Sequence, residues 1–178
     1  RLRTVRTLSE LAGPIHGELT NQRENLILTY VPSFVIGNKF SQEEISQGFR
    51  KALTTYQKRE IAQGATISGP HRDDLKLIID NTEAGAYASR GQSRTAVLSM
   101  KLAESEHLKD QQQQEPILLL DDALSELDTE RRYHVLEKTS QYQQCFITTT
   151  EVESIRQKFL SQMSQFIIKG GEVKLVDS

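Results

Sequence analysis

Apolar positions in the first 65 residues follow the spacing of amphipathic helices, with one strand-like segment between them. From residue 5 to 24 they recur about every 3.6 residues, which predicts a helix. We expect a break or kink near Gly13-Pro14, because proline lacks the amide hydrogen that a helix interior uses. The segment LILTYV, residues 26–31, predicts a strand closed by Pro32. The apolar face of the predicted helix consists of Val5, Leu8, Ala12, Ile15 and Leu19.

The clearest amphipathic helix is predicted for residues 41–62. Ser41 is a suitable N-cap, and Glu44 follows at the spacing of a capping box. Its apolar face consists of Ile45, Phe49, Leu53 and Tyr56.

From about residue 66 onward, strands alternate with helices, which is typical of α/β architecture. We expect the aliphatic run ILLL to be a central strand covered on both faces. QQQQE, residues 111–115, predicts a polar loop that Pro116 ends, and Gly170-Gly171 predict the turn of a hairpin. Strands are predicted at 74–80, 117–121 and 145–150, and helices after residues 89–92, at 128–140 and from 151.

Two adjacent carboxylates, Asp121 and Asp122, follow the ILLL strand directly. Functional groups of α/β sheets gather at the carboxyl ends of strands, where these two acids are predicted to lie. Successive side chains of a strand point to opposite faces, so the two acids are expected to have separate tasks. One can hold Mg²⁺, and the other can orient or deprotonate a water aimed at a phosphoryl group. The simpler interpretation is that both acids end a strand and cap the next helix.

A small, hydroxylated segment, ASRGQSRT at residues 88–95, precedes the next predicted helix. Its backbone amides and the positive end of the helix dipole can meet an anion, and Ser89 can donate to phosphate oxygens. An ordinary helix cap by Ser89 or Ser93 explains the segment equally well. Asp128, in SELD, is expected to lie beyond the sheet edge at the start of a helix.

Taken together, these motifs resemble the ATP-binding-cassette (ABC) ATPase head of the structural-maintenance-of-chromosomes (SMC) group. The resemblance is closer still to the RecF family of bacterial recombination mediators, and it covers the chain as the C-terminal half of such a protein. It rests on GPHRDDL (69–75), SRGQSRT (89–95) and ILLLDDALSELDTERR (117–132). It implies an α/β fold, the C-terminal portion of an ABC/SMC-like head (66–178), preceded by part of a small α+β arm lobe (1–65).

The resemblance also implies roles for single residues. Asp121 matches the magnesium carboxylate of the Walker B motif, Asp122 the catalytic acid, and Asp128 the D-loop acid at a dimer interface. The signature motif, which contacts the γ-phosphate of nucleotide held by the opposite protomer, is matched by Ser89, Arg90, Gly91 and Gln92.

Three departures from the family pattern make slow hydrolysis the expectation. Ala88 stands where leucine usually precedes the serine, and Asp122 is shorter than the glutamate of many relatives. No histidine follows the CFITTT strand (145–150) at the usual switch position.

The sequence contains no phosphate-binding loop of the form G-x-x-x-x-G-K-[ST]. GATISGPH, residues 64–71, has the two glycines but offers Pro70 and His71 where lysine and a hydroxyl residue must follow. In the family this loop lies in the N-terminal half, and the chain begins at Arg1, so we expect a piece of a longer protein. Alone, the piece is expected to bind ATP poorly and to be inactive. The full protein is expected to be a weak DNA-dependent ATPase.

The amino-acid composition limits the classes of protein to which the chain can belong. The formal charge of −2 gives no global basic signature for nucleic-acid binding. Arg50, Lys51, Lys58 and Arg59 can touch DNA phosphates, although a solvated face explains them at least as well. Cys145 is the only cysteine, which excludes an internal disulfide and fits a reducing, cytoplasmic compartment. No apolar run is long enough to span a membrane.

The resemblance implies an ATP-dependent homodimer that binds Mg²⁺ and DNA, with junctions of single- and double-stranded DNA as targets and RecR and RecO as partners. One alternative is the head of another SMC or RecN-like ATPase, although sustained heptads are missing before residue 66. Another is a Mg²⁺-dependent nuclease that uses Asp73, Asp74, Asp121 and Asp122. A third is a non-enzymatic interaction module.

Overall fold

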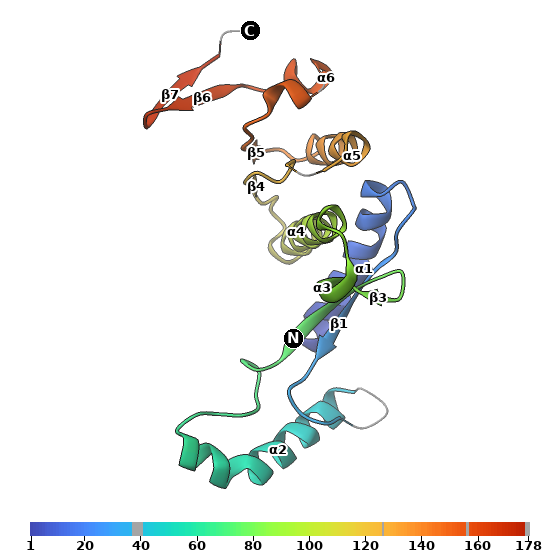
Figure 1. The fold of residues 1–178 in the computed structure, drawn as a ribbon, viewed down its shortest axis with the longest axis vertical. Helices are drawn as coiled ribbons and strands as arrows, with labels where there is room; N and C mark the ends of the chain where they lie inside the picture. The colour runs from blue at the N-terminus through green and yellow to red at the C-terminus, as the bar shows by residue number, and fades with distance from the viewer. Residues whose placement is uncertain (37–40, 126, 156, 177–178) are drawn as a thin grey trace.

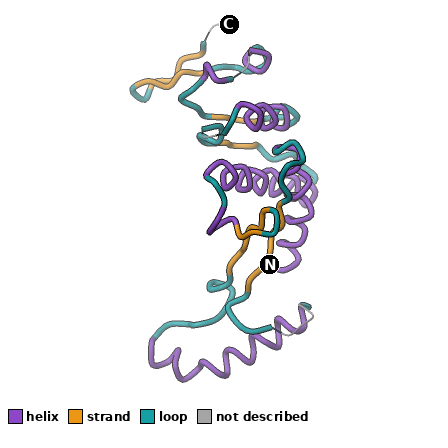
Figure 2. The backbone as a smooth tube through the Cα atoms, turned by 45° about the vertical axis from the view of Figure 1, so that its right-hand side comes forward, coloured by secondary structure: helices purple, strands orange, loops and turns teal. Residues whose placement is uncertain are grey.

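The computed structural model describes residues 1–36, 41–125, 127–155 and 157–176. The molecule is elongated, with α2 at one end and the β6–β7 hairpin at the other (Figure 1). Between them, α1 lies against both β1 and α4 (Figure 2). The elements are α1 (Leu2–Leu19), β1 (Leu26–Val31), α2 (Gln42–Gln63), β2 (Asp74–Ile79), β3 (Thr82–Glu83), α3 (Ala84–Tyr87), α4 (Arg90–Gln112), β4 (Leu118–Leu120), α5 (Thr129–Thr139), β5 (Cys145–Ile147), η1 (Val152–Ser154), α6 (Gln157–Leu160), β6 (Phe166–Lys169) and β7 (Glu172–Leu175).

The first sheet is antiparallel, in the order β1-β2-β3. Leu26 of β1 pairs with Ile79 of β2, and every second residue of β1 is buried against α1, as the alternation of a half-covered strand requires. The predicted strands at 26–31 and 74–80 are both confirmed. The predicted break in the first helix is wrong, because α1 continues through Pro14. Pro14 and Glu10 are exposed, so water can satisfy the carbonyl that proline leaves without a donor.

The second helix begins as predicted. The Ser41 hydroxyl accepts a hydrogen bond from the Glu44 amide at 3.2 Å, and Gly64 ends α2 in the left-handed region. The expected apolar face is only partly covered: Phe49 stacks on Phe34, whereas Leu53 is exposed. Since Ala52 is its one buried residue among those described, α2 belongs to the periphery rather than the core.

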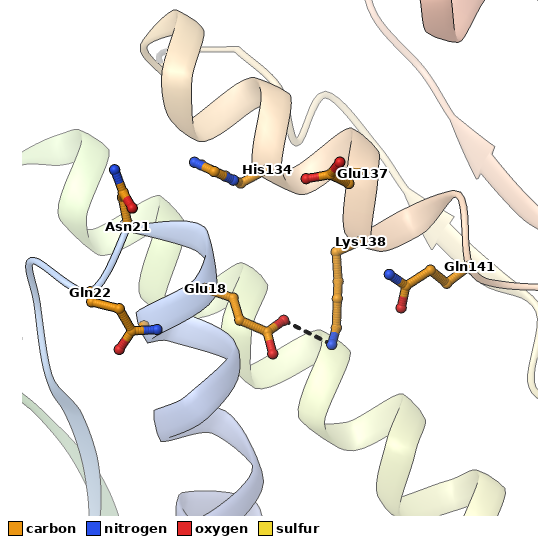
Figure 3. Close-up of a pocket in the computed structure, with 8 residues that line it drawn as sticks. Glu18, Asn21, Gln22, His134, Glu137, Lys138 and Gln141 are labelled. Carbon is orange, nitrogen blue, oxygen red and sulfur yellow. Dashed lines mark ion pairs between the residues drawn. The ribbon is translucent and has the colours of Figure 1, made fainter.

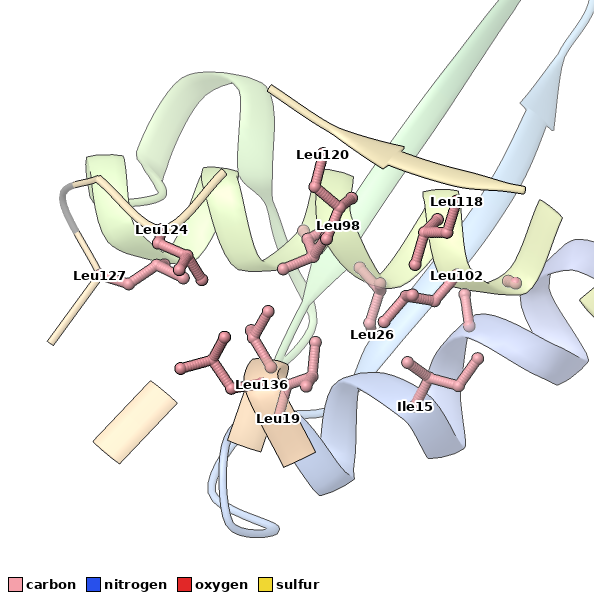
Figure 4. Packing of buried hydrophobic residues seen from close by; sticks show 14 of the residues in the cluster. Ile15, Leu19, Leu26, Leu98, Leu102, Leu118, Leu120, Leu124, Leu127 and Leu136 are labelled. Carbon is pink, nitrogen blue, oxygen red and sulfur yellow. The ribbon is translucent and has the colours of Figure 1, made fainter. Parts of the chain in front are cut away.

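The core lies between α1, β1, α4 and the second sheet (Figure 4). That sheet is a parallel pair, β4 and β5, which α5 connects, so the predicted β-α-β order is confirmed. Apolar residues from distant parts of the chain meet here, and hydrophobic burial of this kind is the main stabilising contribution to a fold. The labelled residues in Figure 4 are Ile15, Leu19, Leu26, Leu98, Leu102, Leu118, Leu120, Leu124, Leu127 and Leu136.

Within this chain, the expectation that the ILLL strand is covered on both faces is wrong. Leu118 and Leu120 are buried, but Leu119 is 70% exposed. Its partner across the parallel pair, Phe146, is 51% exposed. Successive residues of a strand point to opposite faces, so one face of β4–β5 packs on the core and the other is open.

At the C-terminal end, the predicted hairpin is confirmed. β6 and β7 pair antiparallel, and Lys169 is opposite Glu172 across the turn. Gly170 and Gly171 both have positive φ, as a two-residue turn between twisted strands requires. The helix predicted from residue 151 is reduced to the short elements η1 and α6. The apolar residues of the hairpin are exposed, namely Phe166, Ile167, Ile168, Val173, Leu175 and Val176.

Candidate functional site

The two predicted acids lie where the sequence places them, at the carboxyl end of β4. Asp121 is exposed, and its Oδ1 accepts a hydrogen bond of 2.6 Å from the Thr148 hydroxyl. The same hydroxyl accepts from the Asp122 amide at 3.0 Å. Thr148 follows β5, and its amide donates to the Leu120 carbonyl at 3.0 Å. Thr148 therefore ties the acids to the edge of the parallel pair, a contact that sequence reasoning did not identify.

Asp122 begins a turn of unusual backbone geometry. Its φ is +48°, in the left-handed region that residues other than glycine adopt infrequently and that aspartate tolerates better than most. The Ser125 hydroxyl lies 2.8 Å from Asp122 Oδ2 and 2.9 Å from the Asp122 carbonyl oxygen. Leu124, which is buried, anchors this turn in the core. The chain thus leaves the extended direction between the two acids, so they occupy different positions at the sheet edge.

The SRGQ segment forms the start of α4. Ser89 is the N-cap: its hydroxyl accepts from the Gln92 amide at 3.2 Å, and Gln92 Oε1 accepts from the Ser89 amide at 3.0 Å. The cap interpretation is therefore confirmed. It leaves the hydroxyl hydrogen of Ser89 available for donation, because the cap uses only an oxygen lone pair. The amides of Arg90 and Gly91 have no acceptor among the residues that the structure describes.

Arg94 brings the start of α4 beside the acidic turn. Its Nη1 donates to the Asp122 carbonyl oxygen at 3.2 Å and to that of Ser125 at 3.4 Å. The predicted signature segment and the predicted catalytic acid, which are about 30 residues apart in the sequence, are thus connected through one guanidinium group. Exposed carboxylates at the end of a strand can hold a divalent cation, and free amides at the start of a helix can receive a phosphate group.

Asp128 lies at the start of α5, as expected, and caps it. Asp128 Oδ1 accepts from the Arg131 amide at 2.8 Å, and Oδ2 lies 3.3 Å from Arg131 Nε. The side chain is nevertheless exposed on the surface.

A buried polar cluster connects these segments, and sequence reasoning missed it. Glu24, whose side chain is 10% exposed, lies in the turn between α1 and β1. Its Oε1 accepts from Arg131 Nη2 at 2.6 Å and from Gln92 Nε2 at 3.2 Å, and its Oε2 lies 3.2 Å from His16 Nε2. Burial lowers the pKa of His16 below its usual value, although the Glu24 carboxylate acts in the opposite direction. A buried polar residue has no periodic signal, and these partners are far apart in sequence.

The GPHRDD segment is held by local contacts. His71 Nε2 lies 2.6 Å from the Thr66 hydroxyl. Asp73 accepts from the Ser33 amide at 2.8 Å and from the Tyr30 hydroxyl. Burial, together with the nearby Asp73 carboxylate, raises the pKa of Tyr30 to about 12. Asp73 therefore has a structural role at the base of β2.

The described residues do not form the metal cluster that a nuclease would need. Among them, no group of three or more histidine, cysteine, aspartate or glutamate side chains could hold a metal ion. Asp73 and Asp74 precede and begin β2, whereas Asp121 and Asp122 follow β4 in a separate sheet. The structure therefore does not bring the four acids of the nuclease alternative together as one metal-binding group in the described part of the chain.

A cleft lies elsewhere, between the end of α1 and α5, with a volume of ≈ 310 Å³ (Figure 3). Glu18 and Lys138 form an ion pair of 2.9 Å across it, and His134 points into the same region. None of the predicted site residues lines this cleft. No helix in the described ranges is long and apolar enough to cross a membrane.

Comparison with known proteins identifies a consistent set of relatives, although no family model matches the chain. The chain is 39% identical over 97% of its length to the DNA replication and repair protein RecF of Staphylococcus carnosus. It is 41% identical over 95% of its length to RecF of Staphylococcus epidermidis, and 39% identical over 98% to RecF of Lysinibacillus sphaericus. It spans only 46–47% of these proteins, that is, about half the length of the curated relatives it matches.

Two solved structures are also similar to this chain in fold. A structure of the recombination mediator protein RecF with ATP, in the RecFOR pathway, superposes with a TM-score of 0.74 at 29% identity, covering 99% of this chain and 45% of that one. A structure from a study of ATP-driven dimerization of SMC ATPases gives a TM-score of 0.54 at 14% identity, with 98% of this chain and 85% of that one covered. The second likeness shows the fold alone, an α/β ATPase-head fold of the ABC/SMC type.

Proposed function

We propose that this chain, which resembles the C-terminal half of RecF in sequence and in fold, supplies half of each nucleotide site in an ATP-dependent, DNA-binding recombination mediator. The observation that carries the proposal is the position of exposed Asp121 and Asp122 beside the start of α4, with Arg94 joining the two. Carboxylates suit Mg²⁺, and free amides at a helix start suit phosphate oxygens. The acids would serve the protomer's own nucleotide, and the start of α4 would serve the nucleotide of the opposite protomer.

In this proposal each residue has one task. Asp121 holds Mg²⁺, which keeps most of its other positions for water and phosphate oxygens, so a single protein carboxylate is enough. Asp122 orients or deprotonates the attacking water, and Ser125 holds its carboxylate in place. Ser89 donates its hydroxyl hydrogen to the γ-phosphate of nucleotide bound by the opposite protomer. The amides of Arg90 and Gly91 bind the same phosphate, and Gln92 and Asp128 complete the interface.

The uncovered apolar surface supports the view that the site is completed by another part of a longer protein. Leu119 and Phe146 are exposed on one face of β4–β5, and the β6–β7 hairpin exposes apolar residues along its length. Exposed patches of this kind mark interaction surfaces. The lysine-bearing phosphate loop, which this sequence lacks, would come from the same missing part. The chain alone should therefore bind ATP weakly and hydrolyse none.

The wider role follows from the relatives and is part of the proposal. Residues 1–65 form part of an arm lobe, residues 66–178 form part of the head, and two full-length protomers close over ATP on DNA. Slow hydrolysis then releases the dimer. DNA with single- and double-stranded junctions, RecR and RecO are the proposed partners, and the cytoplasm is the proposed compartment. No observation favours an SMC or RecN-like alternative over RecF, since the SMC likeness is limited to the fold.

Nucleotide-dependent association of the full-length protein tests the proposal. Sedimentation with and without ATP and Mg²⁺ should show a monomer that becomes a dimer only with nucleotide. Ser89→Arg should abolish the dimer and leave ATP binding by the monomer intact, because the serine serves the partner's nucleotide. Ser140→Arg, at an exposed serine after α5, is the matched control and should dimerise normally. Dimerisation that does not depend on ATP, or that persists in Ser89→Arg, would refute the proposal.

A further inference from the structure

Glu24 lies where the segments with the proposed partner-facing groups meet. One of its oxygens accepts from Gln92 of the signature segment at 3.2 Å and from Arg131 of α5 at 2.6 Å. Arg131 in turn lies 3.3 Å from the Asp128 carboxylate. Glu24 is 107 residues from Arg131 in sequence and belongs to neither motif.

The Glu24 carboxylate determines how the Gln92 amide is oriented. A carboxylate can only accept hydrogen bonds, so the nitrogen of the Gln92 side chain must face it. The oxygen of the same amide then faces the Ser89 amide at 3.0 Å, which completes the capping box that positions Ser89. The orientation of Ser89 at the start of α4 is thereby linked to a carboxylate on a different segment.

Glu24 also determines how Arg131 is placed. The planar guanidinium is used on three sides: Nη2 toward Glu24, Nη1 toward the Thr95 hydroxyl at 3.1 Å, and Nε toward Asp128. The Arg131 side chain is 19% exposed, and that of Glu24 is 10% exposed, so screening by water is limited. This fixed fork holds Asp128 at the beginning of α5.

We infer that Glu24 is a positioning residue that fixes the signature segment and Asp128 relative to one another, so that both can meet the partner protomer at once. The inference rests on the proposed function, in which Ser89 and Asp128 act across a dimer interface. It goes further by assigning a role to a residue outside all of the recognised motifs. Glu24 itself contacts neither nucleotide nor partner in this role.

Two conservative substitutions of Glu24 in the full-length protein distinguish the effect of side-chain length from the effect of charge. Glu24→Asp keeps the charge next to His16 and Arg131, but a side chain shorter by one methylene cannot reach both Gln92 and Arg131. Glu24→Gln loses the charge but keeps an oxygen at the position that accepts from both. Glu130→Asp is the matched control, because Glu130 is an exposed acid nearby that pairs with Arg23 at 3.0 Å and does not reach the signature segment.

Three measurements on each protein are compared: ATP affinity at a concentration where the protein is monomeric, the dimer dissociation constant with saturating ATP and Mg²⁺, and thermal unfolding. Glu24→Asp should weaken dimerisation about tenfold, with ATP affinity of the monomer unchanged. Glu24→Gln should stay within about threefold of the unsubstituted protein, and Glu130→Asp should match it.

Two results would overturn the inference. One is dimerisation of Glu24→Asp equal to that of Glu130→Asp. The other is an equal loss of dimerisation and of thermal stability in both Glu24 variants, which would make Glu24 structural only. Failure of the unsubstituted protein to dimerise with ATP would count against the proposed function itself, and it is recognised before any variant is compared.

Discussion

The centre of the molecule and its C-terminal side differ in how far their apolar side chains are exposed to solvent. In the centre, α1, β1 and α4 bury Ala12, Leu19 and Leu102 completely. On the C-terminal side, the open face of β4–β5 and both faces of the β6–β7 hairpin expose theirs. Contiguous apolar residues are costly to expose, and a large exposed patch of them often marks a surface that another protein covers. The centre is thus covered within this chain, whereas the apolar surface of the C-terminal side is open and, under the proposed function, packs against further protein.

The same contrast applies to the polar groups of the proposed site. The signature segment, Glu24 and Arg131 are held by hydrogen bonds that link α4, α5 and the turn before β1. Asp121 and Asp122 are held mainly by Thr148 and Ser125 and face solvent. The groups proposed to serve the partner are therefore held by hydrogen bonds within this chain. The groups proposed to act on the protomer's own nucleotide lie at a solvent-exposed sheet edge.

The largest effect is expected at that open edge. In the full-length protein, Asp122→Asn should lower ATP turnover ~10²-fold or more, because an amide cannot accept the proton of the attacking water. ATP binding should persist, since asparagine keeps the shape of the side chain. Steady-state turnover with DNA present measures the effect, and Asp110→Asn, at an exposed aspartate near the end of α4, is the control. Unchanged turnover in Asp122→Asn would favour the non-enzymatic interaction module.

Two neighbouring leucines of β4 test the contrast in coverage. Leu120 is 5% exposed, and Leu120→Ala should cost about 2–5 kcal/mol of unfolding free energy, as core truncations do. Leu119→Ala in the full-length protein should cost about 2 kcal/mol if the missing part covers this face. A solvent-exposed leucine would change stability by only about 0.5 kcal/mol. Chemical denaturation of both variants measures the difference, and a neutral Leu119→Ala would show that the face stays open.

A smaller effect is expected from the buried cluster in the centre. Burial lowers the pKa of His16 in the folded protein, so below about pH 6.5 the unfolded chain binds a proton that the folded chain does not. Stability contributed by neutral His16 is therefore present above this pH and is lost as the pH falls. The loss approaches about 1.4 kcal/mol per pH unit while the folded ring stays neutral. Denaturation at several pH values should show this slope, and His16→Gln should flatten it, whereas equal slopes would contradict it.

Much of the fold could be predicted from the sequence, because its signals are local. The N-cap Ser41, the strands at 26–31 and 74–80, the β-α-β order and the turn at Gly170-Gly171 each depend on neighbouring residues. The errors have physical causes as well. The strand rule for ILLL describes a complete sheet, so it failed where one face of the sheet is open. The helix is not broken at Pro14, where water can reach the carbonyl that loses its donor.

The site was predictable only in part. Asp121, Asp122 and Ser89 could be located from motifs that lie within short stretches, and the structure places them at the sheet edge and at the helix start as expected. Their roles stay predictions. The contacts of Glu24 with Gln92 and Arg131 could not be foreseen, because they join segments 68 and 107 residues apart and leave no periodic trace.

Mixing two inactive full-length variants tests most directly whether each nucleotide site is shared between protomers. Asp122→Asn disables the acid of a protomer's own site, and Ser89→Arg disables its contribution to the partner's site. In a mixed dimer one site carries both defects and the other carries neither. Ser89→Arg does not pair with itself, so any turnover comes from mixed dimers, in which the intact site can still close over its nucleotide. Equal amounts should therefore recover turnover above that of either variant alone. No recovery above the separate variants, despite mixed dimers detected by sedimentation or tagging, would contradict the account.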